Sequence, residues 1–209
     1  VVSFVNAGLL TLTQSIGVIM GANIGTTVTA WLISALGFKV DIAAFSLPLL
    51  AFGIPLLFSG KSSRKSVGEF IFGFSFLFMG LQALKANAPD LGANPEMLAF
   101  VQNYADMGFF SIILFLFIGA ILTMIVQASA ATMAITLIMC ANGWIDYQLG
   151  VALVLGENIG TTITANLAAL TGNTQARRAA LAHLAFNIFG VIWVRSEEHT
   201  SELQSQGDI

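Results

Sequence analysis

Charged side chains are scarce in this sequence. Asp, Glu, Lys and Arg together make up 9% of the 209 residues, whereas a typical soluble domain carries about 25%. Hydrophobic residues make up 56%, and the mean hydropathy is +0.86. Apolar runs follow one another with short polar breaks, and they approach the length of about 20 residues that a bilayer-spanning helix needs. These features exclude an ordinary soluble domain and predict an all-α, multi-pass integral membrane protein embedded in a lipid bilayer.

Cysteine and an excess of either charge are also lacking. The single cysteine, Cys140, excludes an internal disulfide framework. The net charge of −3 arises entirely in residues 195–209, so residues 1–194 are neutral and no nucleic-acid partner is predicted. The sequence shows no metal-ligand cluster, nucleophile motif or P-loop, so we expect neither an enzyme nor a cofactor.

Two copies of one polar, glycine-bearing motif lie inside otherwise apolar segments. They are Gly21–Thr27 (GANIGTT) and Gly156–Thr162 (GENIGTT), which differ only at Ala22 and Glu157. The similarity continues outside the motifs at the same spacing along the chain; for example, Thr29 corresponds to Thr164. An internal repeat of this kind is typical of transporters whose site forms where the two repeats meet.

The apolar runs predict a helical bundle. Helices are expected over about residues 15–36, 41–58, 67–85, 108–126, 148–170 and 179–194, with a short helix in 1–13. The polar stretch 127–132 (QASAAT) interrupts the run 108–140, which predicts a broken or re-entrant helix pair. We assign residues 1–194 to one transmembrane domain, with a partial first repeat in 1–58 and a second repeat in about 108–194.

The basic residues predict the orientation. Loops 59–66 and 171–178 carry Lys and Arg, which are enriched in cytoplasmic loops. If both loops are cytoplasmic, helices 15–36 and 148–170 cross the membrane in opposite directions. The charges and the repeat therefore agree on inverted-topology repeats.

Ten polar residues of the motifs and the break are candidates for binding a substrate or an ion. They are Gln127, Ser129, Thr132, Glu157, Asn158, Thr161, Thr162, Asn23, Thr26 and Thr27. Broken helices present free N–H groups to anions and free carbonyls to cations, and hydroxyls can serve both. These segments contain no Lys or Arg. A bound anion would therefore depend on helix N-termini, hydroxyls and a co-bound cation.

Packing offers a simpler interpretation of the same residues. Gly21 with Gly25, and Gly156 with Gly160, are G-x-x-x-G pairs that bring helices together. Hydrogen bonds between helices could likewise explain the polar residues of the break. His183 and Asn187, one turn apart, are interpreted as packing residues rather than ligands. Asp146 is expected to cap a helix or to face water at a membrane boundary.

The element Gln127–Thr132, followed by Gly156–Thr162, resembles the bacterial type II sodium–phosphate cotransporters. That family repeats a Gln-Ser-Ser-Ser-type element and a Gly-x-Asn-Ile-Gly-Thr-Thr element, and residues 182–187 (AHLAFN) also fit. The resemblance implies sodium-coupled uptake of inorganic phosphate across the bacterial inner (cytoplasmic) membrane. It also implies that the ten candidate residues bind phosphate and sodium, with no other metal.

The sequence departs from that family pattern in three ways. The break reads Gln-Ala-Ser-Ala-Ala-Thr and so has fewer hydroxyls, and Glu157 introduces a carboxylate beside the site. The offset of the repeat would place a first Gln element before Val1, so we expect the sequence to be a fragment. Residues 195–205 (RSEEHTSELQS) resemble the translation of a sequencing-library adapter. We expect residues 195–209 to be an artefactual tail that packs against nothing; a natural disordered tail is the alternative.

Other functions remain open at this point. A passive channel would need a continuous polar stripe along several helices, whereas the polar groups here gather at two places. A membrane sensor or scaffold that responds to phosphate status could use the same residues without transport. A transporter of another small anion is a further alternative.

Overall fold

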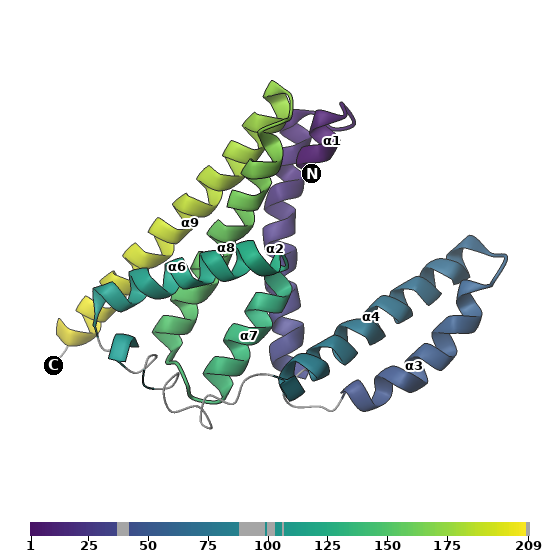
Figure 1. The fold of residues 1–209 in the computed structure, drawn as a ribbon, viewed down its shortest axis with the longest axis horizontal. Helices are drawn as coiled ribbons and strands as arrows, with labels where there is room; N and C mark the ends of the chain where they lie inside the picture. The colour runs from purple at the N-terminus through teal and green to yellow at the C-terminus, as the bar shows by residue number, and fades with distance from the viewer. Residues whose placement is uncertain (37–41, 88–98, 100–102, 106, 208–209) are drawn as a thin grey trace.

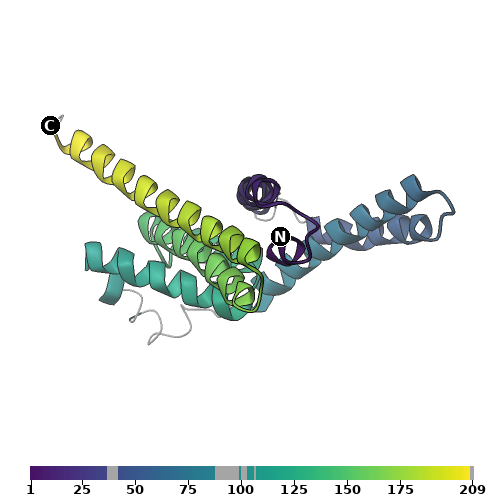
Figure 2. The ribbon, with the colours of Figure 1, turned by 90° about the horizontal axis from the view of Figure 1, so that it is seen from above.

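Helices make up most of the described part of the chain, which in the computed structural model covers residues 1–36, 42–87, 99, 103–105 and 107–207. They are α1 (Val2–Asn6), α2 (Leu12–Leu36), α3 (Ile42–Leu57), α4 (Ser62–Asn87), α6 (Phe109–Val126), α7 (Ser129–Ala141), α8 (Tyr147–Ala169) and α9 (Thr174–Gly207). Figure 1 shows α2 and α6–α9 gathered together, while α3 and α4 form a hairpin that extends to one side. The view from above shows the same arm directed away from α6, α8 and α9 (Figure 2). The prediction of an all-α protein is confirmed.

Among the described residues, three helices contain a span long and apolar enough to cross a membrane; the spans are Leu12–Ala35, Ser62–Ala83 and Phe109–Val126. Large apolar side chains on these and other helices are exposed, among them Trp31 at 72% and Phe52 at 74%. Such surfaces are stable in lipid and unfavourable in water. The chain is therefore a multi-pass membrane protein.

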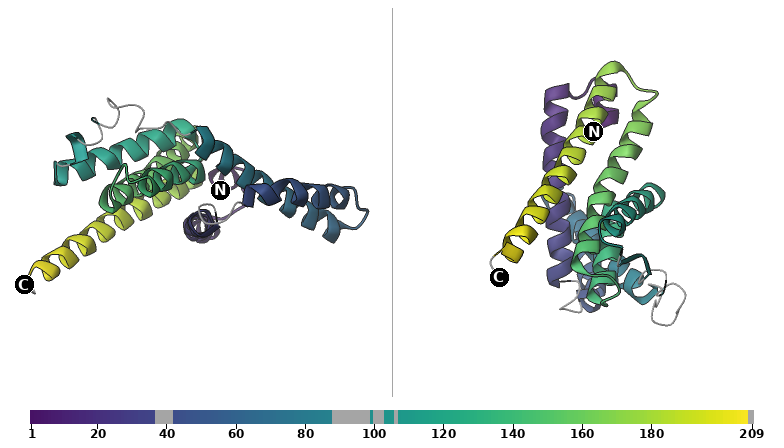
Figure 3. Two further views of the ribbon diagram at one scale, coloured as in Figure 1. Left: turned by 90° about the horizontal axis from the view of Figure 1, so that it is seen from below. Right: turned by 90° about the vertical axis from the view of Figure 1, so that its left-hand side faces the viewer.

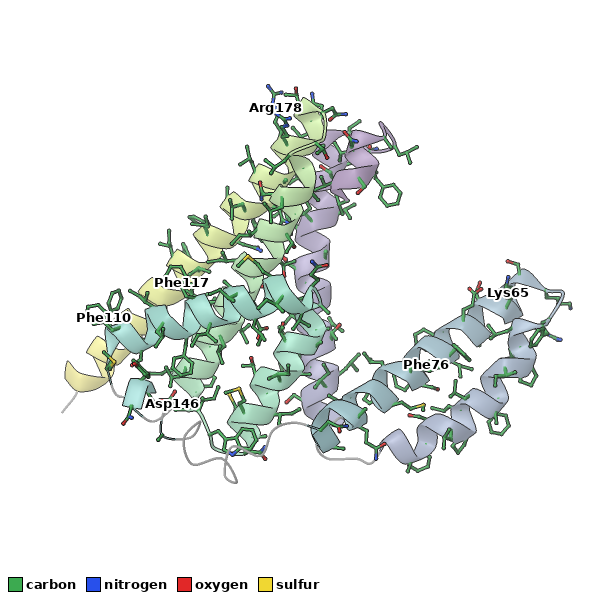
Figure 4. The ribbon with its side chains drawn as sticks, viewed as in Figure 1. Lys65, Phe76, Phe110, Phe117, Asp146 and Arg178 are labelled. Carbon is green, nitrogen blue, oxygen red and sulfur yellow. The ribbon has the colours of Figure 1, made fainter. Side chains whose placement is uncertain are left out.

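Arg178 and Asp146 lie near opposite ends of the helical pair α8 and α9, with Phe110 and Phe117 on α6 between these levels (Figure 4). Asp146 caps α8, because its carboxylate accepts a hydrogen bond of 2.8 Å from the Leu149 amide. The expected capping role of Asp146 is confirmed. Both phenylalanines are more than half exposed, as lipid-facing residues should be.

Three helix boundaries differ clearly from the sequence predictions. The helix α4 begins at Ser62 and α9 begins at Thr174, inside segments predicted to be loops, and α9 continues to Gly207. Asn173 helps to start α9, since its side chain accepts a hydrogen bond of 2.9 Å from the Ala176 amide. The predicted end near residue 194 is wrong. Arg, Glu, Gln and Leu favour helix, and adding residues to an existing helix costs less than starting a new one.

The helices that carry the two motifs run in opposite directions. In Figure 1, α2 descends from the end near α1, whereas α8 rises toward that end. Two further views show α9 beside both of them (Figure 3), and α2 packs mainly against α9 and α7. The opposed directions agree with the predicted inverted repeats.

The glycines of the second motif lie where α6 crosses α8. A methyl group added at Gly156 would meet the Leu116 carbonyl, and one added at Gly160 would meet the Ala120 carbonyl. Only glycine permits such a close approach of two backbones. Methyl groups at Gly21 and Gly25 would meet no described atom of another segment within 4 Å. The packing interpretation therefore holds for the second motif and not for the first.

Candidate functional site

The chain breaks between α6 and α7 at the predicted place. Gln127 has left-handed backbone angles (φ 56°, ψ 23°). In the described part of the chain, every other residue with positive φ is a glycine. Ala128 is extended, and α7 begins at Ser129. A side chain disfavours left-handed angles, so this conformation marks a strained turn. The turn leaves the N-terminal amides of α7 without partners inside their own helix.

A pocket of about 270 Å³ opens at this break. Its lining combines the turn, the first residues of α7 and hydroxyl-bearing residues of α6 and α8. The lining residues are Thr123, Gln127, Ala128, Ser129, Ala130, Thr161 and Thr164. Amides and hydroxyls thus gather around one space of a size suited to a small ion rather than a large organic ligand.

Three of the predicted site residues line this pocket: Gln127, Ser129 and Thr161. Sequence reasoning missed two others, Thr123 and Thr164. A signal for Thr164 was available, because it lies three residues after Thr161 and therefore on the same helix face. The Thr164 hydroxyl donates to the Thr161 carbonyl at 2.8 Å. Thr123 is one turn before Gln127 and sits in an apolar run, where nothing in the sequence distinguishes it.

A layer of buried hydroxyls lies behind the pocket. The hydroxyl of Thr132 is 3.2 Å from that of Thr123, and it donates to the Ser129 carbonyl at 3.0 Å. Thr123 and Thr132 are 2% and 0% exposed. Through Thr123, the pocket therefore connects with the interior between α6 and α7.

Glu157 lies on α8, on the side that meets α7, and is 1% exposed. One of its carboxylate oxygens accepts a hydrogen bond of 2.7 Å from the Thr136 hydroxyl. Its other oxygen, Oε2, is buried and has no hydrogen-bond partner among the described residues. The Thr132 hydroxyl also lies near this carboxyl. A buried acid with an unsatisfied oxygen is costly unless something neutralises it.

The remaining residues of the second motif face elsewhere. Thr162 is 0% exposed and donates to the Ile159 carbonyl of its own helix at 2.7 Å. Asn158 uses its backbone carbonyl, which accepts a hydrogen bond of 2.9 Å from the Asn187 side chain. Neither residue lines the pocket.

One side chain joins the two motifs. Asn187, on α9, donates to the Asn158 carbonyl and accepts a hydrogen bond of 2.9 Å from the Asn23 side chain. Asn187 is 7% exposed, and both bonds are partly buried. Two positions of the internal repeat, far apart in sequence, therefore meet at one amide. These bonds between helices agree with the interpretation of Asn187 as a packing residue, although its partners were not predicted.

The other two candidates of the first motif, Thr26 and Thr27, do not line the pocket. Thr26 donates to the Ala22 carbonyl at 3.1 Å, and Thr27 donates to the Asn23 carbonyl at 3.2 Å. Both bonds lie within α2. The structure thus connects the first motif to the second through Asn23 alone among its three candidates.

Oxygen atoms dominate the possible ligands. In the described part of the chain, no group of three or more His, Cys, Asp or Glu gathers. A cation here would be held by one carboxylate with hydroxyl and carbonyl oxygens, which suits a hard ion such as sodium. The unsatisfied Glu157 oxygen is an observation that fits such an ion.

Comparison with known proteins gives a consistent result. The family described as Na+/Pi-cotransporter matches residues 1–86 and 98–208. The uncharacterized protein YqeW of Bacillus subtilis is 32% identical over 197 residues, covering 93% of this chain and 60% of that protein. The putative inorganic phosphate export protein YjbB of Escherichia coli K12 is 29% identical over 192 residues, which is 91% of this chain and 34% of that protein.

A mammalian protein is similar over a shorter stretch. The sodium-dependent phosphate transport protein 2C of Mus musculus is 38% identical over 89 residues, covering 41% of this chain and 15% of that protein. No solved structure matches the chain. The family match reaches into residues 195–208. Whether the tail is an artefact stays a prediction.

Proposed function

Because the chain belongs to the Na+/Pi-cotransporter family, we propose that it carries inorganic phosphate across the bacterial cytoplasmic membrane with sodium as the coupling ion. The chain spans 60% of the length of YqeW and 34% of that of YjbB. The proposal therefore concerns the part of the transport machinery that this chain contains.

The pocket at the start of α7 is the observation that carries the proposal. A helix N-terminus bears about half a positive charge and free amide donors, so it attracts anions. Ser129 adds a hydroxyl to the same space. The hydroxyls of Thr161 and Thr164 also line it; in this structure they donate to carbonyls of α8, and they would have to rotate to donate to phosphate. Phosphate, with its several acceptor oxygens, suits such a set of donors.

The charge of phosphate is the reason for a coupling ion. No Lys or Arg lies on α6, α7 or α8, and half a charge from one helix cannot neutralise an anion that carries one to two charges. An under-neutralised anion in a poorly solvated site is unfavourable. Sodium bound nearby would supply the missing positive charge, and each ion would then raise the affinity for the other.

The first motif would provide the second half of the site. Asn23, Thr26 and Thr27 are the groups that we propose approach phosphate or sodium during transport, together with Asn158 and Thr162. The link through Asn187 supports this for Asn23 and Asn158, because it holds the two motifs together.

The direction of transport has two candidates. YjbB is named as a putative phosphate exporter, whereas the mouse protein is named as sodium-dependent. Uptake driven by sodium is the direction that we propose, and export is the second candidate. The names of these relatives describe those proteins only.

The test is transport of radiolabelled phosphate in proteoliposomes that contain the purified protein. Phosphate movement is measured with sodium higher outside, higher inside, or equal on both sides. Coupled transport predicts phosphate movement that follows the sodium gradient. Equal rates in all three conditions would refute coupling, and phosphate binding without any movement would favour a sensor. Excess sulfate as a competitor tests whether the pocket prefers another anion.

A further inference from the structure

We propose that Glu157, with the hydroxyls of Thr132 and Thr136, binds the coupling sodium ion in a buried site between α7 and α8. This inference rests on the proposed function, since it assigns one ion of that function to named side chains. The pocket at the helix break would then hold only the anion. Sodium and phosphate would occupy two neighbouring sites that share the hydroxyl pair of Thr123 and Thr132.

Burial of Glu157 is the first reason. The side chain is 1% exposed, and its oxygen Oε2 has no hydrogen-bond partner among the described residues. Moving an unpaired carboxylate out of water into a protein interior costs on the order of several kcal/mol. The single hydrogen bond from Thr136 offsets part of this cost. A cation on the free oxygen would offset much more.

Among the described residues, no Lys, Arg or His side chain forms a salt bridge with Glu157. The helices α6 and α7, which pack against this part of α8, contain no Lys, Arg or His. On α9, Arg177 donates to the Leu170 carbonyl at 2.7 Å. Leu170 lies 13 residues after Glu157 (170 − 157), which is about 20 Å along a helix. A sodium ion on Oε2 would supply the positive charge that these helices lack. Protonation of Glu157 is the alternative way to remove its charge, and it predicts sodium binding that is unchanged in Glu157→Gln.

The available ligand atoms suit sodium. The Thr136 hydroxyl donates its hydrogen to the carboxylate, so its lone pairs remain free to face a cation. The Thr132 hydroxyl lies near the same carboxyl. Hydroxyl and carboxylate oxygens are hard ligands, and in membrane transporters sodium is often held beside a broken helix.

This arrangement would make coupling obligatory. Without sodium, the negative charge of Glu157 opposes a second negative charge in the adjacent pocket. With sodium bound, the charge of Glu157 is cancelled and phosphate can enter. The hydrogen-bonded pair of Thr123 and Thr132 lies between the two places, since Thr123 lines the pocket and Thr132 lies near Glu157.

The first experiment measures binding of radiolabelled sodium to the purified protein in nanodiscs, without phosphate. Glu157→Gln removes the charge at almost constant volume, and Thr136→Val removes one hydroxyl while keeping the acid. We expect the sodium affinity to fall roughly tenfold or more in Glu157→Gln and by a smaller factor in Thr136→Val. Ser75→Ala is the matched control, because Ser75 on α4 also has a buried oxygen without a described partner. Its sodium affinity should equal that of the wild type.

The second measurement is phosphate affinity with and without sodium. Sodium should raise the phosphate affinity of the wild type, and Glu157→Gln should bind phosphate with an affinity that no longer depends on sodium. Unchanged sodium binding in Glu157→Gln would overturn the inference and leave sodium coupling intact. If the wild type transports phosphate without binding sodium, both the inference and the coupling fail. Should Glu157→Gln not fold, unchanged sodium affinity in Thr136→Val overturns the assignment.

Discussion

Replacing Asn187 by alanine should weaken the junction of α2, α8 and α9, because one side chain holds both motifs there. The substitution removes a bond of 2.9 Å to Asn23 and another of 2.9 Å to the Asn158 carbonyl. Hydrogen bonds between membrane helices are worth about 0.6 kcal/mol on average and up to about 1.7 kcal/mol. Two such bonds, with Asn187 buried, predict a loss of about 1 to 3 kcal/mol in the free energy of unfolding.

A double-mutant cycle isolates the bond between the two side chains. Asn23→Ala, Asn187→Ala and the double variant are unfolded in mixed micelles, and the interaction energy is obtained from the three differences. We expect a favourable interaction of about 1 kcal/mol between Asn23 and Asn187. The control cycle pairs Asn23→Ala with Ser75→Ala, which lies on α4, and should give additive losses.

The sodium dependence of phosphate uptake is a second measurement, and a loss of stability alone would not change it. Phosphate uptake by Asn187→Ala should lose part of its dependence on sodium, whereas Ser75→Ala should keep it. An interaction energy of zero between Asn23 and Asn187 would refute the link between the motifs. Full sodium dependence in a destabilised Asn187→Ala protein would show that the link serves folding only.

Three further outcomes are expected. Ser129→Ala and Thr161→Val should reduce sodium-dependent phosphate uptake while insertion into the membrane is retained, and unchanged uptake would remove both residues from the site. Gly156→Ala should destabilise the protein by about 1 to 3 kcal/mol because its methyl group meets the Leu116 carbonyl. Gly21→Ala should be neutral or stabilising, because no described segment approaches Gly21 and alanine favours helix by about 1 kcal/mol; equal losses would contradict the packing difference. A chain ending at Val194 should fold and transport like the full chain, and a fall in its melting temperature would show that residues 195–209 contribute contacts.

The helices and the break were predictable because they depend on local composition. Long apolar runs specify where helices lie, and the polar residues 127–132 specify where one is interrupted. The helix starts at Ser62 and Thr174 were not predicted, since polar residues next to a membrane helix can continue it into water. Hydropathy predicts which part of a helix lies inside the bilayer, but it does not predict the residue at which the helix begins or ends.

The partners of each side chain were not predictable from the sequence. Thr123 lies in an apolar helix, and its role depends on how α6 and α7 meet after the strained turn at Gln127. Asn187 gains its importance from α9 lying between α2 and α8. Neighbouring residues of the motif also have different surroundings, because consecutive side chains on a helix point about 100° apart. Thr161 therefore lines the pocket while Thr162 is buried against its own helix.

The two motifs share six of seven residues and yet have different surroundings, which shows what a site requires. In the second motif, the glycines let α6 approach, and Thr161 then meets the first turn of α7. In the first motif, Gly21 and Gly25 meet no other described segment, and Thr26 and Thr27 bond only within α2. The motif sequence alone thus does not make a pocket. A pocket forms where the motif packs against a broken helix, and Asn187 connects the first motif to Asn158 of the second motif, outside that pocket.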